Sequence, residues 1–150
     1  MRKVIIYQIS DEIEIEKFFQ LKSFSHTAKI NIEDLQIKVF TGYDKKTFVD
    51  ALEIADYLKT KMIYRHDALN KKPENLNKAL AYLSSLIFKE NYDVLFLITY
   101  FEQARILPKI FAQHFNKSNK LRFDTLPGAI SCIDFEKKEF SIYIPNTILN

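Results

Sequence analysis

Apolar residues gather along this chain in two kinds of pattern, and the first kind predicts strands. Short runs that are apolar almost without interruption are typical of strands covered on both faces. Such runs are bounded by polar residues at four places: Lys3–Ile9, Leu35–Thr41, Met62–Tyr64 and Val94–Ile98. A sheet with helices on both sides is therefore expected.

The second pattern repeats every three to four residues and predicts helices between the strands. In Lys45–Lys59, for example, Phe48, Leu52 and Ala55 fall on one face. The predicted helices are Asp11–Phe24, Lys45–Lys59, a segment opened by Pro73, and Glu102–Phe115, which contains Pro108.

The end of the chain predicts a hairpin, with strands Ala129–Phe135 and Glu139–Ile144 joined at Glu136–Lys138. This order of elements predicts one α/β domain over residues 1–150. It is a three-layer sandwich, with a mostly parallel central sheet, helices on both faces and a C-terminal hairpin. The strands expected to be central neighbours are Val4–Tyr7, Ile37–Phe40 and Val94–Ile98.

Composition narrows the function classes. With only Gly42 and Gly128, the chain has no glycine-rich phosphate loop. The net charge of +3 is scattered, so no nucleic-acid partner is expected. The single Cys132 excludes an intrachain disulfide and a cysteine zinc cluster, and no metal or cofactor is expected. No apolar run is long enough for a signal peptide or a membrane span, so we expect a soluble cytoplasmic protein without a membrane partner.

Four stretches resemble one known family, the histidine phosphatase (phosphoglycerate mutase-like) superfamily, and its short phosphohistidine phosphatase-like members in particular. The resemblance covers nearly the whole chain and implies the fold predicted above. The four stretches are Lys3–Asp11, Val39–Ala51, Val94–Leu107 and Leu126–Ile133.

The resemblance also implies a chemistry. In the family a histidine attacks phosphorus and becomes phosphohistidine. Two arginines and a second histidine hold the phosphoryl oxygens, and a carboxylate protonates the leaving group.

Carried over residue by residue, this pattern loses its catalytic groups. The first arginine falls on Gln8, the nucleophile on Ile9 and the second histidine on Tyr100. The second arginine falls on Lys46, which keeps the positive charge without the bidentate fork. The glycine of the motif falls on Ser10, and the acid near Asn70–Lys71.

The resemblance implies that five residues meet at one mouth: Gln8, Thr41, Lys46, Tyr100 and Arg105. We expect a catalytically degenerate protein, a binding or regulatory domain for a phosphorylated or anionic ligand or for a protein partner. Whether the mouth binds an anion or is filled by its own side chains stays open at this point. The alternative is an active phosphoester (phosphohistidine) phosphatase using substitute residues, with Lys46 and Arg105 as phosphate clamps.

Three further features of the sequence have more than one interpretation. Arg65–His66 is interpreted as a surface loop pair rather than a displaced catalytic histidine. Asp11-Glu12 resembles the acidic pair of receiver domains, but Asp44 comes too early and Thr99 too late for the remaining receiver residues. Phe101 beside the mouth is a candidate protein contact.

Overall fold

The computed structural model describes residues 2–9, 35–114 and 130–143. The predicted helix Asp11–Phe24 and the predicted turn at Pro127–Gly128 lie outside the described residues. No described helix is long and apolar enough to cross a membrane.

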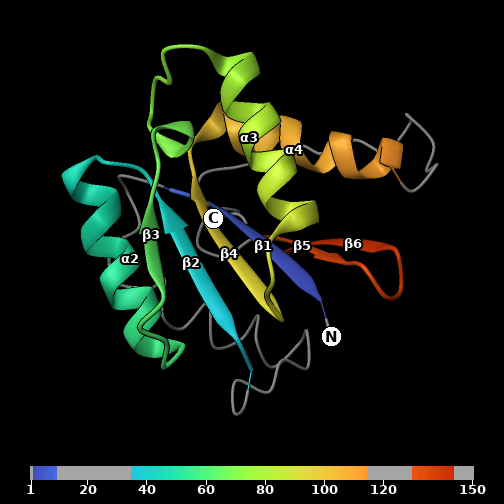
Figure 1. The fold of residues 1–150 in the computed structure, drawn as a ribbon, viewed down its shortest axis with the longest axis horizontal. Helices are drawn as coiled ribbons and strands as arrows, with labels where there is room; N and C mark the ends of the chain where they lie inside the picture. The colour runs from blue at the N-terminus through green and yellow to red at the C-terminus, as the bar shows by residue number, and fades with distance from the viewer. Residues whose placement is uncertain (1, 10–34, 115–129, 144–150) are drawn as a thin grey trace, which may run out of the picture.

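A six-stranded sheet forms the centre of the fold, in the order β3-β2-β4-β1-β5-β6, which runs from left to right in Figure 1. The neighbours β3, β2, β4 and β1 are parallel, while β5 and β6 are antiparallel additions beyond β1. The strands are β1 (Lys3–Gln8), β2 (Ile37–Thr41), β3 (Ile63–Arg65), β4 (Val94–Thr99), β5 (Ile130–Asp134) and β6 (Glu139–Tyr143). The prediction that the first, second and fourth apolar runs are adjacent central strands is confirmed.

Alternation of side chains along each strand builds two separate apolar layers, one on each face of the sheet. On one face, Ile5, Phe96 and Ile98 belong to the layer that packs against α2 (Lys45–Tyr57). On the other, Val4 and Leu97 belong to the layer that packs against the remaining helices. These are the short 3₁₀ helix η1 (Asp67–Leu69), α3 (Leu76–Lys89) and α4 (Phe101–His114). The three-layer α/β sandwich is thus present.

Helix α2 ends in a Schellman motif. The Lys59 N–H donates to the Asp56 carbonyl and the Thr60 N–H to the Ala55 carbonyl, at 3.1 and 3.0 Å. Lys59 has a positive φ of 55°, a conformation that glycine adopts more readily. The chain then turns back into β3, one residue later than the sequence predicted.

Helix α3 begins at Leu76 rather than at Pro73. The Asn75 side chain caps it, because Oδ1 accepts a hydrogen bond from the Lys78 N–H at 3.1 Å. An N-terminal asparagine satisfies an otherwise unpaired N–H, and here it overrides the preference of proline for a first helical turn. Helix α4 includes Pro108 near its middle.

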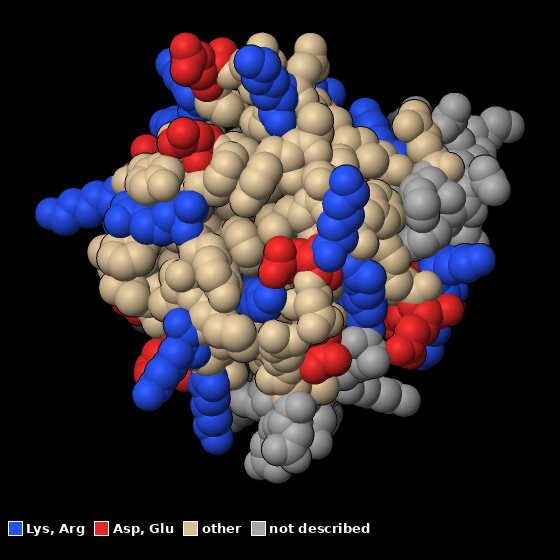
Figure 2. All heavy atoms as spheres, in the orientation of Figure 1, with Lys and Arg blue, Asp and Glu red and all other residues tan. Residues whose placement is uncertain are grey.

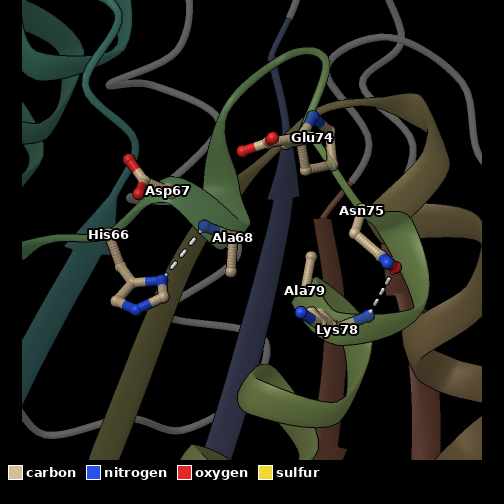
Figure 3. A pocket seen from close by; sticks show the side chains of 8 residues that line it. His66, Asp67, Ala68, Glu74, Asn75, Lys78 and Ala79 are labelled. Carbon is tan, nitrogen blue, oxygen red and sulfur yellow. Dashed lines mark hydrogen bonds between the residues drawn. The ribbon is translucent and has the colours of Figure 1, made fainter.

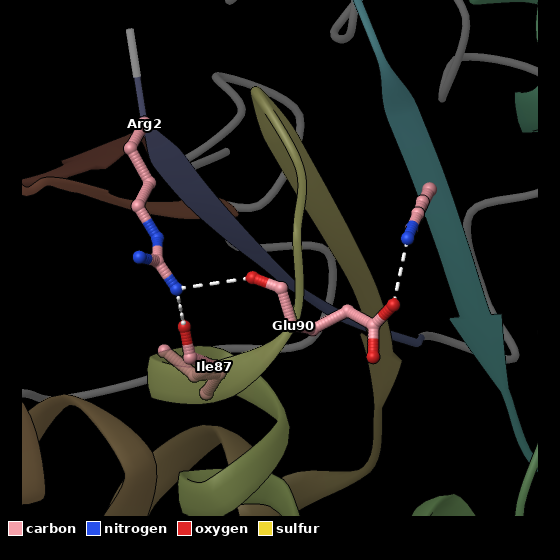
Figure 4. A network of polar contacts seen from close by, with 4 residues as sticks. Arg2, Ile87 and Glu90 are labelled. Atoms are coloured by element: carbon pink, nitrogen blue, oxygen red, sulfur yellow. Dashed lines mark hydrogen bonds and ion pairs between the residues drawn. The ribbon is translucent and has the colours of Figure 1, made fainter.

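The C-terminus of α3 is held by Arg2, which lies just before β1 (Figure 4). Arg2 Nη2 donates to the carbonyls of Ile87 and Glu90, at 2.6 and 3.2 Å. The guanidinium also lies over the ring of Tyr92, 4.7 Å from its centre. On β2, Lys38 pairs with the Glu90 carboxylate at 2.7 Å. A cation at a helix C-terminus is stabilising because the last carbonyls carry partial negative charge.

Candidate functional site

The carboxyl ends of three parallel strands meet at one edge of the sheet, and the residues predicted from the family lie there. Gln8 of β1 is opposite Thr99 of β4, and Phe40 of β2 is opposite Leu97 of β4. In open α/β sheets this edge is where ligands bind. We call it the strand edge.

The two residues at the end of β1 carry no usable nucleophile. Ile9, at the position of the family's histidine, is 8% exposed, and its N–H donates to the Thr99 carbonyl at 3.0 Å. Gln8, at the position of the first arginine, is 4% exposed. Its Oε1 has no hydrogen-bond partner among the described residues. A neutral amide and an aliphatic side chain thus lie where the resemblance predicted the first arginine and the nucleophile.

The threonines at the strand edge are buried as well. Thr41 is fully buried, and its Oγ1 has no hydrogen-bond partner within the described part of the chain. The Thr41 carbonyl accepts a hydrogen bond from the His66 N–H at 2.8 Å. Thr99 Oγ1 donates to the Tyr7 carbonyl at 2.9 Å. The hydroxyl of Thr99 therefore ties two strands together and is not directed to a ligand.

Lys46 lies where the sequence predicted, in the first turn of α2. Partial positive charge at a helix N-terminus favours an anion nearby. Asp44 precedes the helix without capping it, since its Oδ2 accepts a hydrogen bond from the Lys71 N–H at 3.2 Å. The N-terminus of α2 beside Lys46 therefore favours an anion, whereas the Asp44 carboxylate before the helix disfavours one.

Arg105 lies one turn inside α4 and pairs with Glu102, with 3.2 Å between Nη2 and Oε2. Its guanidinium also lies 5.8 Å from the centre of the Phe101 ring. Phe101 itself is 50% exposed. The charge of Arg105 is already balanced on its own helix, so it is a weaker phosphate clamp than the sequence suggested.

The backbone N–H groups at both strand-to-helix corners are already bonded to side-chain oxygens. After β2, the Tyr43 N–H donates to Asn70 Oδ1 at 2.7 Å. After β4, the Tyr100 N–H donates to Gln103 Oε1 at 3.1 Å. An anion at a helix N-terminus is held by backbone N–H groups of this kind. One such N–H at each corner is therefore already engaged by a side chain of the protein itself, Asn70 after β2 and Gln103 after β4.

Gln103 also fixes the loop that carries Asn70. It is fully buried, and its Nε2 donates to the carbonyls of Ala68 and Asn70, at 3.2 and 2.9 Å. The loop approaches Gly42 so closely that a Cβ there would lie 2.6 Å from Asn70 Oδ1 and 2.7 Å from the Leu69 carbonyl oxygen. Glycine is needed at residue 42 because the loop packs directly on its backbone.

Sequence reasoning missed Asn70 and Gln103. A glutamine three residues after a helix start is half of a capping box, and its side chain returns to the N–H of the cap residue. The capping box was not recognised in the sequence because Tyr100, at the cap position, is not a usual capping residue. Asn70 gave no signal beyond its place near the position of the family's acid.

A pocket of about 490 Å³ lies on the neighbouring part of the surface, between η1 and the first turn of α3 (Figure 3). Its charged and polar lining residues are His66, Asp67, Glu74, Asn75 and Lys78. His66 Nδ1 accepts a hydrogen bond from the Ala68 N–H at 3.0 Å, so that nitrogen is engaged in capping η1. The imidazole also stacks on Tyr82, with ring centres 3.5 Å apart. His66 follows the last residue of β3 directly and has a structural role.

The buried Tyr7 hydroxyl, one residue before the end of β1, is held in its neutral form. Burial raises the pKa of the Tyr7 hydroxyl far above its ordinary value, and the nearby Asp50 carboxylate raises it further. A phenol held in this way is a poor base and a poor nucleophile at neutral pH. No group of three potential metal-ligating side chains occurs among the described residues.

Comparison with known proteins gave structural matches only. No protein-family model and no curated protein sequence matches this chain. Three solved structures are similar over 95% of it. The first is a phosphoglycerate mutase from Plasmodium falciparum, at 14% identity and a TM-score of 0.56, with 99% of that chain covered.

The second is a functionally characterised protein from Mycobacterium tuberculosis, at 9% identity and a TM-score of 0.59, with 96% covered. The third is a protein from Nakamurella multipartitia assigned as the phosphohistidine phosphatase SixA, at 6% identity and a TM-score of 0.54, with 94% covered. At these identities the likeness concerns the fold. The chain therefore has the histidine phosphatase-like fold that its sequence resemblance implied.

Proposed function

We propose that this protein is a non-catalytic binding domain, built on a histidine phosphatase-like fold, that contacts a protein partner at the strand edge. The observation that carries the proposal is the occupation of both corner amides by Asn70 and Gln103. Phosphoryl transfer needs such N–H donors to be unoccupied and already oriented toward the transition state. A buried isoleucine also lies where the resemblance predicted the nucleophile. The strand edge therefore supplies neither a nucleophile nor these two N–H donors.

The residues that flank the strand edge favour a protein contact. Tyr43 and Phe101, at the corners after β2 and β4, are 55% and 50% exposed. Each lies against an arginine: the Arg65 guanidinium is 5.2 Å from the Tyr43 ring centre, and Arg105 is similarly placed on Phe101. Exposed aromatic residues and arginines are enriched among the residues that dominate protein–protein affinity.

Charge supports a protein partner over nucleic acid. On the face shown in Figure 2, basic and acidic side chains are interspersed, with broad uncharged areas between them. A nucleic-acid site would present a continuous basic stripe.

A hydrolysis assay tests the absence of catalysis. We expect turnover of an aryl phosphate and of a phosphohistidine peptide to remain at the buffer rate. Ile9→His should not restore activity, because the arginines and the second histidine are still missing and such groups act as a unit. Turnover clearly above buffer that is lost in Lys46→Ala, but kept in the exposed α4 variant Lys109→Ala, would overturn the proposal in favour of an active phosphatase.

Anion binding without catalysis is the second candidate, and the position of Lys46 in the first turn of α2 favours it. A single cation at a helix N-terminus supports binding of free phosphate on the order of millimolar, or roughly −4 kcal/mol. A phosphate titration followed by amide chemical shifts distinguishes the two candidates. Saturable shifts at residues 42–46 that vanish in Lys46→Ala would establish an anion site, whereas none at tens of millimolar leaves the protein contact.

A further inference from the structure

The pocket between η1 and the first turn of α3 has a lining that no step of the proposed function uses (Figure 3). None of its lining residues is one of the five that the resemblance predicted at the mouth. The floor is apolar, because Ala68 and Ala79 are 4% and 6% exposed and belong to one core layer. Two alanines on neighbouring elements leave room that larger apolar side chains would fill. The volume of about 490 Å³ lies within the range of small-molecule sites in proteins.

Hydrogen bonds fix both walls of this pocket in advance of binding. On the η1 side, Gln103 Nε2 donates to the Ala68 carbonyl at 3.2 Å, and the Ala68 N–H donates to His66 Nδ1 at 3.0 Å. On the α3 side, the Asn75 side chain caps the helix by accepting a hydrogen bond from the Lys78 N–H. The ordering of loops is one of the costs that weaken binding, and it is largely avoided here.

The hydrogen bond to His66 also determines which ring nitrogen carries the proton. Because Nδ1 accepts a hydrogen bond, the proton of the neutral imidazole lies on Nε2. The ring is held flat against Tyr82, with 3.5 Å between ring centres and 6° between planes. His66 therefore contributes an oriented N–H donor to the lining of the pocket.

The charges in the lining have both signs, with an excess of carboxylate. Asp67 and Glu74 are negative, Lys78 is positive, and all three side chains are exposed. None of the three forms an ion pair in the part of the chain that the structure describes. A simple anion would meet two carboxylates, and a simple cation would meet the ammonium group. The complementary ligand carries one negative and two positive groups.

We propose that this pocket binds a free basic α-amino acid, arginine or lysine. Such a molecule has one carboxylate and two cationic groups, which complement the two carboxylates and one ammonium group of the lining. Its carboxylate is matched by Lys78, by the His66 N–H and by the partial positive charge at the N-terminus of α3. Its two cations are matched by Asp67 and Glu74, and its aliphatic stem by the apolar floor. The proposal goes beyond the proposed function and does not depend on it.

A titration with arginine, followed by the amide chemical shifts of the whole chain, tests the pocket. We expect saturable shifts at residues 66–69 and 74–79, with a dissociation constant on the order of 0.1–1 mM, because the contacts are few and partly exposed. The absence of saturable shifts there at tens of millimolar arginine overturns the proposal.

Three arginine derivatives test which groups of the ligand are recognised. Citrulline has a neutral side chain, Nα-acetylarginine lacks the α-ammonium group, and arginine amide lacks the carboxylate. Each should bind at least about fivefold more weakly than arginine, since each leaves a charged lining group without its counterpart. If citrulline binds as tightly as arginine, the side-chain cation is not recognised and the proposal is wrong. If Nα-acetylarginine does so, the pocket takes the C-terminal residue of a peptide, and a free amino acid is ruled out.

Variants that remove one charge connect the binding to the named side chains. Asp67→Asn and Glu74→Gln should each weaken arginine binding about three- to tenfold, whereas Lys78→Gln should weaken arginine binding but not that of arginine amide. Matched controls are Asp56→Asn, on α2 across the sheet, and Lys89→Gln, at the far end of α3, which should leave the dissociation constant unaltered. Pocket variants that bind arginine as tightly as the controls do would overturn the proposal.

Discussion

At the residue scale, Gln103 holds together the corner of the strand edge that follows β4. A single fully buried amide accepts one hydrogen bond from the start of α4 and donates two to the loop before α3. All three partners are backbone groups. The other corner is closed separately by Asn70, whose Oδ1 accepts a hydrogen bond from the Tyr43 N–H.

We predict that Gln103→Leu lowers the free energy of unfolding by about 2–4 kcal/mol, since a buried N–H and two carbonyls lose their partners. Urea unfolding measures this change. Gln113→Leu, at an exposed position of the same helix, should change stability by less than about 0.5 kcal/mol. Equal effects of the two substitutions would contradict a locking role for Gln103.

Residue type alone was enough to predict the roles of some residues at the strand edge, but not of others. That Ile9 cannot act as a nucleophile follows from its residue type alone, because an aliphatic side chain has no reactive group. The ion pair of Arg105 with Glu102 could not be predicted, because it depends on side-chain geometry. Asn70 was unpredictable, since its bond to the Tyr43 N–H joins residues 27 positions apart.

At the element scale, the end of α2 holds a lysine in the left-handed conformation, and this position offers a stabilising change. Lys59→Gly should raise the free energy of unfolding by up to about 1 kcal/mol, because glycine adopts a positive φ without a steric penalty. Lys61→Gly, two residues later and without a positive φ, should instead be neutral or destabilising. Thermal unfolding of both variants checks the prediction, and a loss of stability in Lys59→Gly would refute it.

The connection between Arg2 and α3 gives a second prediction at this scale. Arg2→Gln should lower the free energy of unfolding by about 1.5–3 kcal/mol, because two hydrogen bonds from a charged group and the contact with the Tyr92 ring are weakened. Lys89→Gln, in the exposed last turn of α3, is the matched loss of charge and should have a small effect. If both variants unfold at the same urea concentration, Arg2 does not hold the helix.

The elements themselves were largely predictable from the pattern. Runs that are apolar on both faces identified β1, β2 and β4, and the helical repeat placed α2 within two residues of its observed end. The start of α3 was wrong by three residues, because Asn75 caps the helix while Pro73 lies outside it. Local pattern fixes the type of an element, and capping side chains fix its ends.

At the scale of the whole molecule, burial of ionisable groups makes the fold sensitive to alkaline pH. The pKa of the Cys132 thiol is raised from 9.0 to about 11, mainly by burial, with Lys3 opposing the rise and Asp134 adding to it. The unfolded chain loses this proton first, so the contribution is complete below pH 9 and is lost as the pH rises towards 11. Tyr7 acts in the same direction above pH 10.

We therefore predict that the free energy of unfolding, measured in urea with a reductant present, falls between pH 9 and pH 11. In Cys132→Ala the cavity lowers stability at every pH, but the decline over this interval should be shallower by about 2–3 kcal/mol. Parallel pH profiles for the two proteins would show that the thiol does not contribute.

The order of elements predicted the overall architecture, but it did not predict the hydrogen bonds that close the strand edge. Alternating strands and helices leave few topologies open, so the sheet and its layers could be expected. The Asn70 side chain accepts a hydrogen bond from the Tyr43 N–H, and the Gln103 side chain donates to the Ala68 and Asn70 carbonyls. These contacts join residues far apart in the chain, so the hydrophobic pattern does not predict them.

The strand order also affects how the chain folds during its synthesis. In the sheet, β4 separates β1 from β2, although both precede it in the chain. During synthesis β1 has no neighbour until β4 is complete, at residue 99 of 150, and until then β2 can pair only with the three-residue strand β3. Loop closure over such separations slows folding and leaves strands unprotected meanwhile. The nascent chain is therefore most in need of a chaperone before β4 emerges.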